Sequence, residues 1–165
     1  MKTVFRFILL AALVALGVWL WFVLFPGPEA VIRQRLTKLA RTASFSAGEG
    51  NLARLAATQD LAGFFATNVE VDINVPGRVQ HTLVGRDEIK QAALGARSTL
   101  TGLKVTFPDI NVAVAPGQQS AVADLTLEAR IAGENDSIVQ ELKLTLQKTG
   151  DGWLITRVET VRTLS

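Results

Sequence analysis

Chemically reactive side chains are scarce in this sequence. It contains a single histidine, His81, and has neither cysteine nor tyrosine. With one histidine and no thiol, a zinc site of the usual composition cannot be assembled. No serine occupies a Gly-x-Ser-x-Gly context, so the sequence offers no nucleophilic triad of that kind either. We therefore expect no metal, no cofactor and no catalytic residue of an established type.

Acid–base chemistry would have to use the carboxylates or His81, and the strand pattern separates these groups. Apolar and polar residues alternate in several segments, which gives each predicted strand one apolar face. His81 and Gln140 are the polar residues on those apolar faces. His81 is then either a base or donor facing a ligand, or a partly buried histidine bonded to the backbone. The acids alternate onto the polar faces: Glu70, Asp72, Asp124, Glu128 and Glu141.

The elements that position these residues follow from hydrophobic periodicity. Helical patterns occur over residues 32–43, 51–65 and 86–98, and a β-hairpin with its turn at Pro76-Gly77 is expected between the second and the third. Four strands joined by short turns follow, and such neighbours pair antiparallel. Their expected ranges are 100–115, with a bend at Pro108, 119–132, 137–148 and 153–164.

This order predicts an α+β domain in which about three helices pack on one face of a curved antiparallel sheet. Two stretches, GRDEI at 85–89 and GDGWLITR at 150–157, resemble the nuclear-transport-factor-2-like superfamily, also called SnoaL-like or cystatin-like α+β. The resemblance covers Pro28 to Leu164 and implies a cone-shaped interior. Aromatic residues at such positions are either ordinary core or pocket lining. The candidates for that pocket are His81, Gln140, Phe64, Phe65, Phe107 and Trp153.

The superfamily includes isomerases, and their chemistry is poorly matched by this sequence. A mechanism of that type needs a carboxylate base in an apolar pocket and donors for the developing oxyanion, commonly a tyrosine and a protonated aspartate. The chain has no tyrosine, and its pattern places the acids on the outer face. The resemblance therefore predicts a fold rather than a reaction.

An uncharged run of nineteen residues extends from Phe7 to Phe25. As a helix it would span about 28 Å, close to the thickness of a bilayer's hydrocarbon core. Trp19 and Trp21 suit the headgroup level. We expect residues 1–25 to be an uncleaved single-pass anchor and residues 26–165 to be the domain. A cleaved signal peptide is the alternative, but the run is long for one and ends in bulky residues.

The basic residues are concentrated near this anchor. Of the 17 basic residues, Lys2 and Arg6 precede the apolar run, so residues 26–165 carry 15 basic and 15 acidic residues. A neutral domain is a poor nucleic-acid binder, and no nucleic acid is expected. The one local excess lies opposite the apolar arc of the first domain helix, where it forms either a solvated face or a contact with lipid headgroups. Its residues are Arg33, Arg35, Lys38 and Arg41.

Lys2 and Arg6 favour a cytoplasmic amino terminus and a periplasmic domain on the outer face of a bacterial inner membrane. The first expectation is a non-enzymatic accessory subunit, which forms a homodimer or binds a membrane-complex partner through the convex face of its long strands. The alternatives are a module for a small apolar ligand, or an isomerase- or dehydratase-like enzyme using His81. A filled cone favours the first, an open apolar cone the second, and an open cone with a carboxylate facing His81 the third.

Overall fold

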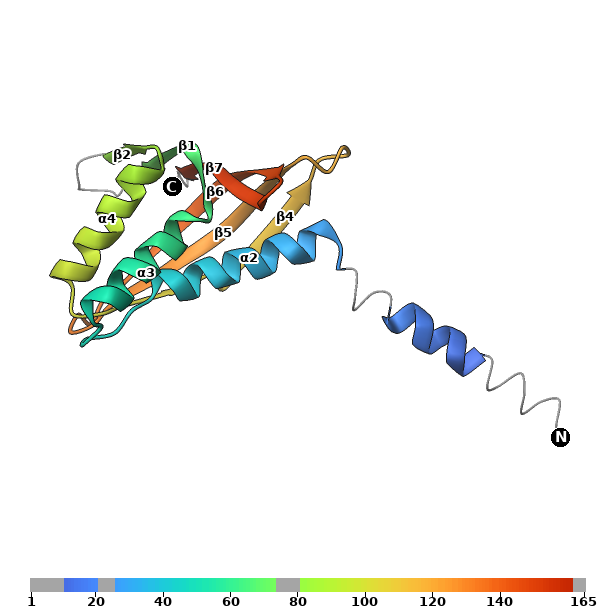
Figure 1. The fold of residues 1–165 in the computed structure, drawn as a ribbon, viewed down its shortest axis with the longest axis horizontal. Coiled ribbons are helices and arrows are strands. Elements are labelled where there is room, and N and C mark those ends of the chain that lie inside the picture. Colours follow the sequence, from blue (N-terminus) through green and yellow to red (C-terminus); the bar gives the residue numbers. More distant parts are fainter. Residues whose placement is uncertain (1–10, 21–25, 74–80, 162–165) are drawn as a thin grey trace.

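The computed structural model describes residues 11–20, 26–73 and 81–161, and of His81 it describes the backbone alone. Residues 11–20 are helical. The domain helices are α2 (Pro28–Ala43), α3 (Asn51–Ala62) and α4 (Arg86–Thr99) (Figure 1). The strands are β1 (Phe65–Ile73), β2 (His81–Val84), β3 (Leu103–Thr106), β4 (Ile110–Val114), β5 (Ser120–Ile131), β6 (Ser137–Thr149) and β7 (Gly152–Thr160).

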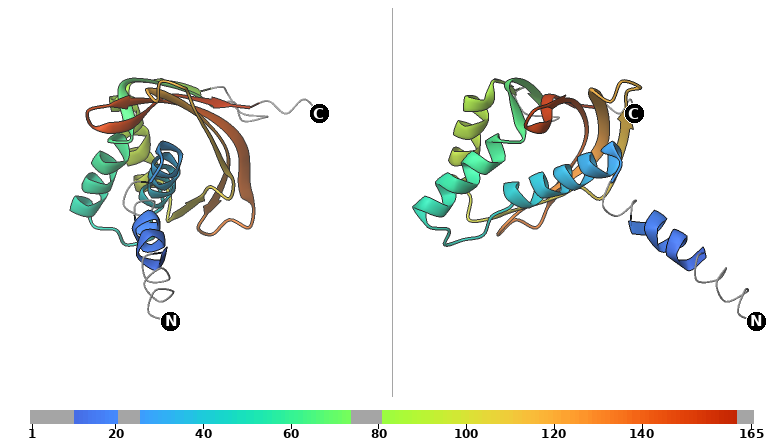
Figure 2. Two further views of the ribbon diagram at one scale, coloured as in Figure 1. Left: turned by 90° about the vertical axis from the view of Figure 1, so that its right-hand side faces the viewer. Right: turned by 45° about the vertical axis from the view of Figure 1, so that its right-hand side comes forward.

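One strongly curved sheet wraps around α2, and α3 and α4 cover its open side (Figure 2). The strand order is β2-β1-β7-β6-β5-β3, with β4 also paired to β5. The pairs β3–β5, β4–β5, β5–β6 and β6–β7 are all antiparallel. The predicted α+β architecture is thus confirmed. The bend expected at Pro108 is also present, because the chain divides there into β3 and β4.

The sequence pattern missed one strand pairing. β1 pairs with β7 in parallel, which places the first hairpin beside the last strand of the chain. Alternation shows which face of a strand is apolar, but it carries no information on which distant strand lies beside it. This pairing closes the helices and the sheet around one interior, because β1 contacts α4 while β7 continues into the long strands.

Glycines set the ends of two helices. The prediction that the second helix continues to Phe65 is wrong: α3 ends at Ala62 with Gly63 as its cap, and β1 begins at Phe65. Gly85 precedes α4 with φ +88°, a backbone conformation that residues other than glycine rarely adopt. Beyond this turn, the carboxylate of Glu88 accepts a hydrogen bond from the Val84 amide at 2.7 Å. Two acidic residues, Asp87 and Glu88, occupy the first turn of α4, where the helix dipole favours carboxylates.

The leucines in the first half of α3 are exposed, although their spacing contributes to the helical pattern. Leu52 is 84% and Leu55 is 55% exposed, whereas the buried residues of this helix are Thr58 and Ala62. Only the C-terminal half of α3 contributes to the interior, since Leu61 packs against the core. The spacing that predicted the helix was correct, but it did not identify the side that is covered.

The predicted anchor falls mostly outside the described residues. Of the run from Phe7 to Phe25, the structure describes residues 11–20, so Trp21 lies outside it. In the described part of the chain, no helix combines the length and apolar character needed to cross a membrane.

Candidate ligand-binding cavity

An apolar cavity of about 300 Å³ lies between the three helices and the curved sheet. Every described residue that lines it is aliphatic or phenylalanine, so no lining side chain in the described ranges carries a charge or a hydroxyl group. The lining residues are Leu39, Ala43, Leu61, Phe65, Val71, Ile73, Leu83, Ile89, Ala92, Ala93, Val105, Phe107, Leu127, Leu142, Leu144, Ile155 and Val158.

Local sequence explains why this interior is open. On α4, residues 89, 92 and 93 follow the i, i+3, i+4 spacing that keeps side chains on one face of a helix. Two of these three are alanines, and α2 contributes a further alanine, Ala43. Short side chains on both helices leave space that leucine or phenylalanine would fill.

The cavity has a buried base and a more accessible rim. At the base, Leu144 is 3% and Ile155 is 2% exposed. Toward the rim, Ile73 and Leu83 of the first hairpin are half-buried, and Ala92 on α4 is exposed. An opening of the cavity therefore lies along α4. The backbone of His81 pairs with that of Ile73, beside this rim, while its side chain lies outside the described residues.

The structure brings two of the predicted pocket residues to the cavity. Phe65 and Phe107 line it. Phe64 and Trp153 are buried in the core, where they are 6% and 3% exposed, and neither lines the cavity. Gln140 on β6 is half-buried opposite Leu127, outside the lining. The contribution of α4 was not identified from the sequence, although the spacing of Ile89, Ala92 and Ala93 was a usable signal.

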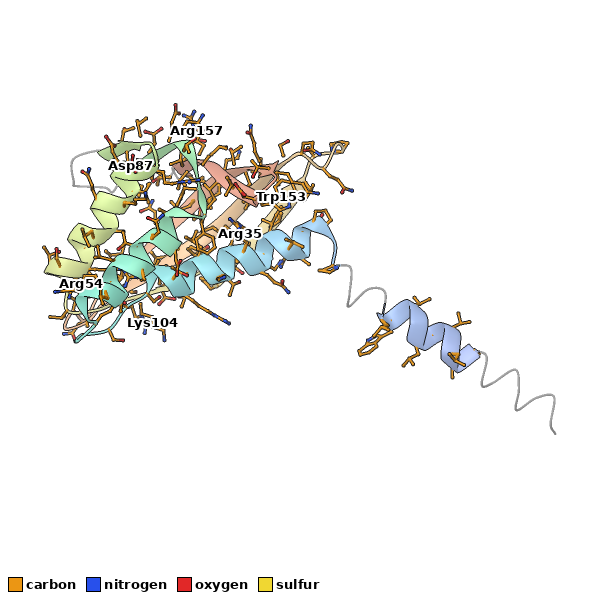
Figure 3. All side chains as sticks on the ribbon, in the orientation of Figure 1. Arg35, Arg54, Asp87, Lys104, Trp153 and Arg157 are labelled. Carbon is orange, nitrogen blue, oxygen red and sulfur yellow. The ribbon has the colours of Figure 1, made fainter. Side chains whose placement is uncertain are left out.

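The acids of the sheet lie outside the cavity, as alternation predicts. None of the five lines it, and Glu70 and Asp72 pair with Arg157, which lies at the outer surface (Figure 3). Arg157 contacts Glu70 at 3.2 Å, Asp72 at 3.6 Å and Glu159 at 2.9 Å. All of these groups are partly exposed, so the cluster is a solvated surface network of modest energetic value.

Arg35 does not share the exposed face of α2, contrary to prediction. Its guanidinium lies 5.1 Å from the centroid of the Phe64 ring and donates a hydrogen bond to the Gly63 carbonyl at 3.1 Å. Burial lowers the pKa of Arg35 below its ordinary value, and the carboxylate of Asp151 opposes part of this shift. Arginine nevertheless stays protonated in proteins, so Arg35 links α2 to the start of β1 as a cation. The other three bases of this helix, Arg33, Lys38 and Arg41, are exposed, as is Trp19.

A buried ion pair holds the loop between α2 and α3 against α4. The Arg97 side chain is 2% exposed, and its Nη1 lies 2.8 and 2.7 Å from the two carboxylate oxygens of Glu49. Its guanidinium also lies 4.8 Å from the Phe45 ring centroid and donates to the Thr42 carbonyl. This pair fixes the end of α4, the helix that carries the cavity's alanines.

Comparisons with solved structures identify the fold. A Novosphingobium aromaticivorans protein of NTF2-like, cystatin-like fold is 21% identical, with 78% of this chain and 79% of that one covered at a TM-score of 0.56. An NTF2-like protein of unknown function from Pseudomonas putida is 11% identical, with coverages of 83% and 87% and a TM-score of 0.61. Another Novosphingobium aromaticivorans protein, provisionally named scytalone dehydratase, is 18% identical, with coverages of 81% and 82% and a TM-score of 0.58.

The chain thus has the NTF2-like, cystatin-like fold that the sequence resemblance implied. No family model matches it, and neither does any curated protein. At these identities the likeness establishes the fold, and one fold of this kind hosts many activities. Function must therefore be argued from the cavity.

Proposed function

We propose that this chain is a membrane-tethered binding module that holds one small apolar ligand in its cone. The observation that carries the proposal is that every described residue lining the 300 Å³ cavity is apolar. Ligand pockets start at about this size, and an engineered apolar cavity of about 150 Å³ binds benzene. Twice that volume suits a ligand of about twelve carbon atoms, such as an alkyl chain or a two-ring hydrocarbon.

The energetics of an empty cavity support an occupant. An enclosed dry void costs roughly 24 cal/mol of stability per Å³, and the buried base of this cavity would bear such a cost while its open rim would not. Water fills such a space poorly because the described lining offers it no hydrogen-bonding side chain. An apolar ligand would remove this cost while making no demand for polar contacts.

The same lining separates this proposal from its two rivals. An accessory subunit without a ligand would be expected to fill its cone with side chains, whereas this interior is open. Enzymatic acid–base chemistry would need a proton acceptor inside, and none of the described lining residues supplies one. His81, beside Ile73, is the residue on which that reading would depend.

The tether is proposed from the apolar run of residues 7–25 and from the exposure of its described part, residues 11–20. In the helical residues 11–20, six large apolar side chains are between 48% and 63% exposed. Such a continuous apolar surface is unfavourable in water and suits a bilayer. We propose an amino terminus in the cytoplasm and the domain on the outer face of a bacterial inner membrane. Reporter fusions to the carboxyl terminus test this orientation, and cytoplasmic reporter activity would contradict it.

Photo-crosslinking tests the binding proposal on the full chain in membranes. A dodecyl diazirine would be activated by light, and the labelled peptides would be mapped by mass spectrometry. Labelling of residues 83–93 and 142–144, and its loss when unlabelled dodecanol competes, would support the cavity as the binding site. Labelling confined to residues 7–25 would mean that the probe resides only in the bilayer, and the proposal would fail. His81→Gln serves as a control: binding should persist in it, whereas turnover of any substrate that is lost in this variant would favour the enzymatic reading.

A further inference from the structure

The exposed face of α2 carries bases without acidic partners. Arg33, Lys38 and Arg41 are exposed and project from the side of the helix opposite the buried Ile32 and Leu36. Among the described residues, none of these three bases forms an ion pair. No acidic residue occurs anywhere between positions 30 and 48. Small and polar residues separate the bases and line a shallow hollow with them: Ala30, Gln34, Thr37 and Thr42.

The fold adds a further base at the C-terminal end of this face. The backbones of Phe45 and Leu103 exchange hydrogen bonds of 2.8 and 2.9 Å, and the Val105 amide donates to Ser44 Oγ at 2.9 Å. Lys104, exposed between these two contacts, is thereby held next to the end of α2 (Figure 3). Sequence spacing could not reveal this neighbour, because Ser44 and Val105 are 61 positions apart.

This local charge requires an explanation because the domain as a whole is neutral. Residues 26–165 carry as many acidic as basic residues, so a face with bases alone is a departure from the rest of the surface. A polynucleotide is usually bound by a broader basic surface. Three bases spaced along one helix, with Lys104 of β3 beside its end, instead match the discrete phosphates of lipid headgroups.

We propose that this face of α2 docks on the anionic phospholipid headgroups of the membrane that holds the tether. The inference rests on the proposed tether, which brings the face into reach. α2 begins at Pro28, three residues after the end of the apolar run, which is at most about 10 Å of extended chain. That distance is about one Debye length at physiological salt. Arg33 and Arg41 are about 12 Å apart along the helix axis, so a helix lying along the surface presents both.

Docking would also hold the cavity near the bilayer. The opposite side of α2 lines the cavity through Leu39 and Ala43. A helix with its side chains is about 10 Å across, so a cavity behind a docked α2 lies about one helix diameter from the headgroups. A ligand with an alkyl chain would then have a short route from the bilayer to the cone.

Fluorescence quenching on the reconstituted full chain tests this docking. Because the chain has no cysteine, T37C places a single fluorophore on the proposed face and Q147C places one on exposed β6 as a control. The quencher is a lipid with a spin-labelled headgroup, in vesicles of phosphatidylcholine with or without phosphatidylglycerol. We expect the label at T37C to be quenched in the anionic vesicles, much less in the neutral ones, and less again at high salt. The label at Q147C should stay unquenched in both.

Charge-neutralising variants supply the sharper comparison. Each base near an anionic surface raises the affinity for the membrane about fivefold, so R33Q/K38Q/R41Q should lower the affinity of this face for anionic vesicles about a hundredfold. K90Q/K143Q/K148Q removes the same charge elsewhere and should leave quenching intact. Equal quenching in both vesicle compositions, or an unchanged response of the first triple variant, would overturn the proposal. So would occupation of this face by an added DNA duplex in place of vesicles. Flotation of the chain after an alkaline wash reports on the tether alone, so the two proposals can fail separately.

Discussion

Ala93→Leu tests whether the cavity exists, because the sign of its effect on stability depends on empty space. Ala93 lies on α4 and lines the cavity. Leucine adds three carbons, worth up to about 2.4 kcal/mol at roughly 0.8 kcal/mol for each buried methylene. Since Ala93 is half-buried, we expect about 1–2 kcal/mol of stabilisation in the unliganded chain. Helix propensity contributes little, as alanine and leucine are both good helix formers.

The matched control is Ala123→Leu. Ala123 is 0% exposed in β5 and does not line the cavity, so the same three carbons would overpack a filled core and cost about 1–3 kcal/mol. Urea denaturation of both variants measures the free energy of unfolding, and thermal melts should show shifts of opposite sign, with Ala93→Leu raising Tm by about 3–7 °C. If Ala93→Leu destabilises the chain as much as Ala123→Leu does, the interior is filled and the argument from the cavity fails.

Three further outcomes follow from other parts of the structure. Glu49→Gln should lower the free energy of unfolding by about 3 kcal/mol in urea denaturation, because it leaves Arg97 buried beside a neutral partner. Glu128→Gln, at a surface pair with Arg130, should lower it by less than about 1 kcal/mol. Equal losses in the two variants would contradict this difference in burial. Deleting residues 1–25 should leave a soluble domain that still unfolds in one cooperative transition, and an unfolded product would refute domain independence. K143E places a like charge between Asp124 and Glu159 on the convex face, so it should weaken self-association in sedimentation while K148E should not; a strictly monomeric parent chain would refute that interface.

Local pattern was sufficient for much of this fold. Alternation predicted that each strand has one apolar face, and the apolar rows of β5 and β6, which include Ala123 and Leu144, are indeed buried, because a strand with one covered face has a strict period of two. The start of α4 is also local in origin, because the acidic residues of its first turn suit the positive end of the helix dipole. What the pattern could not supply was the parallel pairing of β1 with β7, since their register is determined by packing between distant segments.

In the candidate site, too, some features were predictable from the sequence and others were not. Phe65 and Phe107 were predicted as pocket residues, but the open space depends on small side chains such as Ala92 and Ala93, and a sequence does not show what faces an alanine. Arg35 illustrates a different limit. On a helical wheel it lies about 40° from the buried Leu39, close enough for a long side chain to reach inward, so its exposure could not be read from its charge.

Ligand stoichiometry measured by native mass spectrometry tests the central claim most directly. The full chain, released from a membrane mimetic in the presence of dodecanol, should retain one molecule and saturate at one, because the cavity has room for about twelve carbons. Ala93→Phe should abolish this retention by occupying the same space, while the surface control Lys148→Gln should bind as the parent chain does. If the parent chain retains no ligand, or if Ala93→Phe retains as much as the parent, the cavity is not a binding site and the proposed function is wrong.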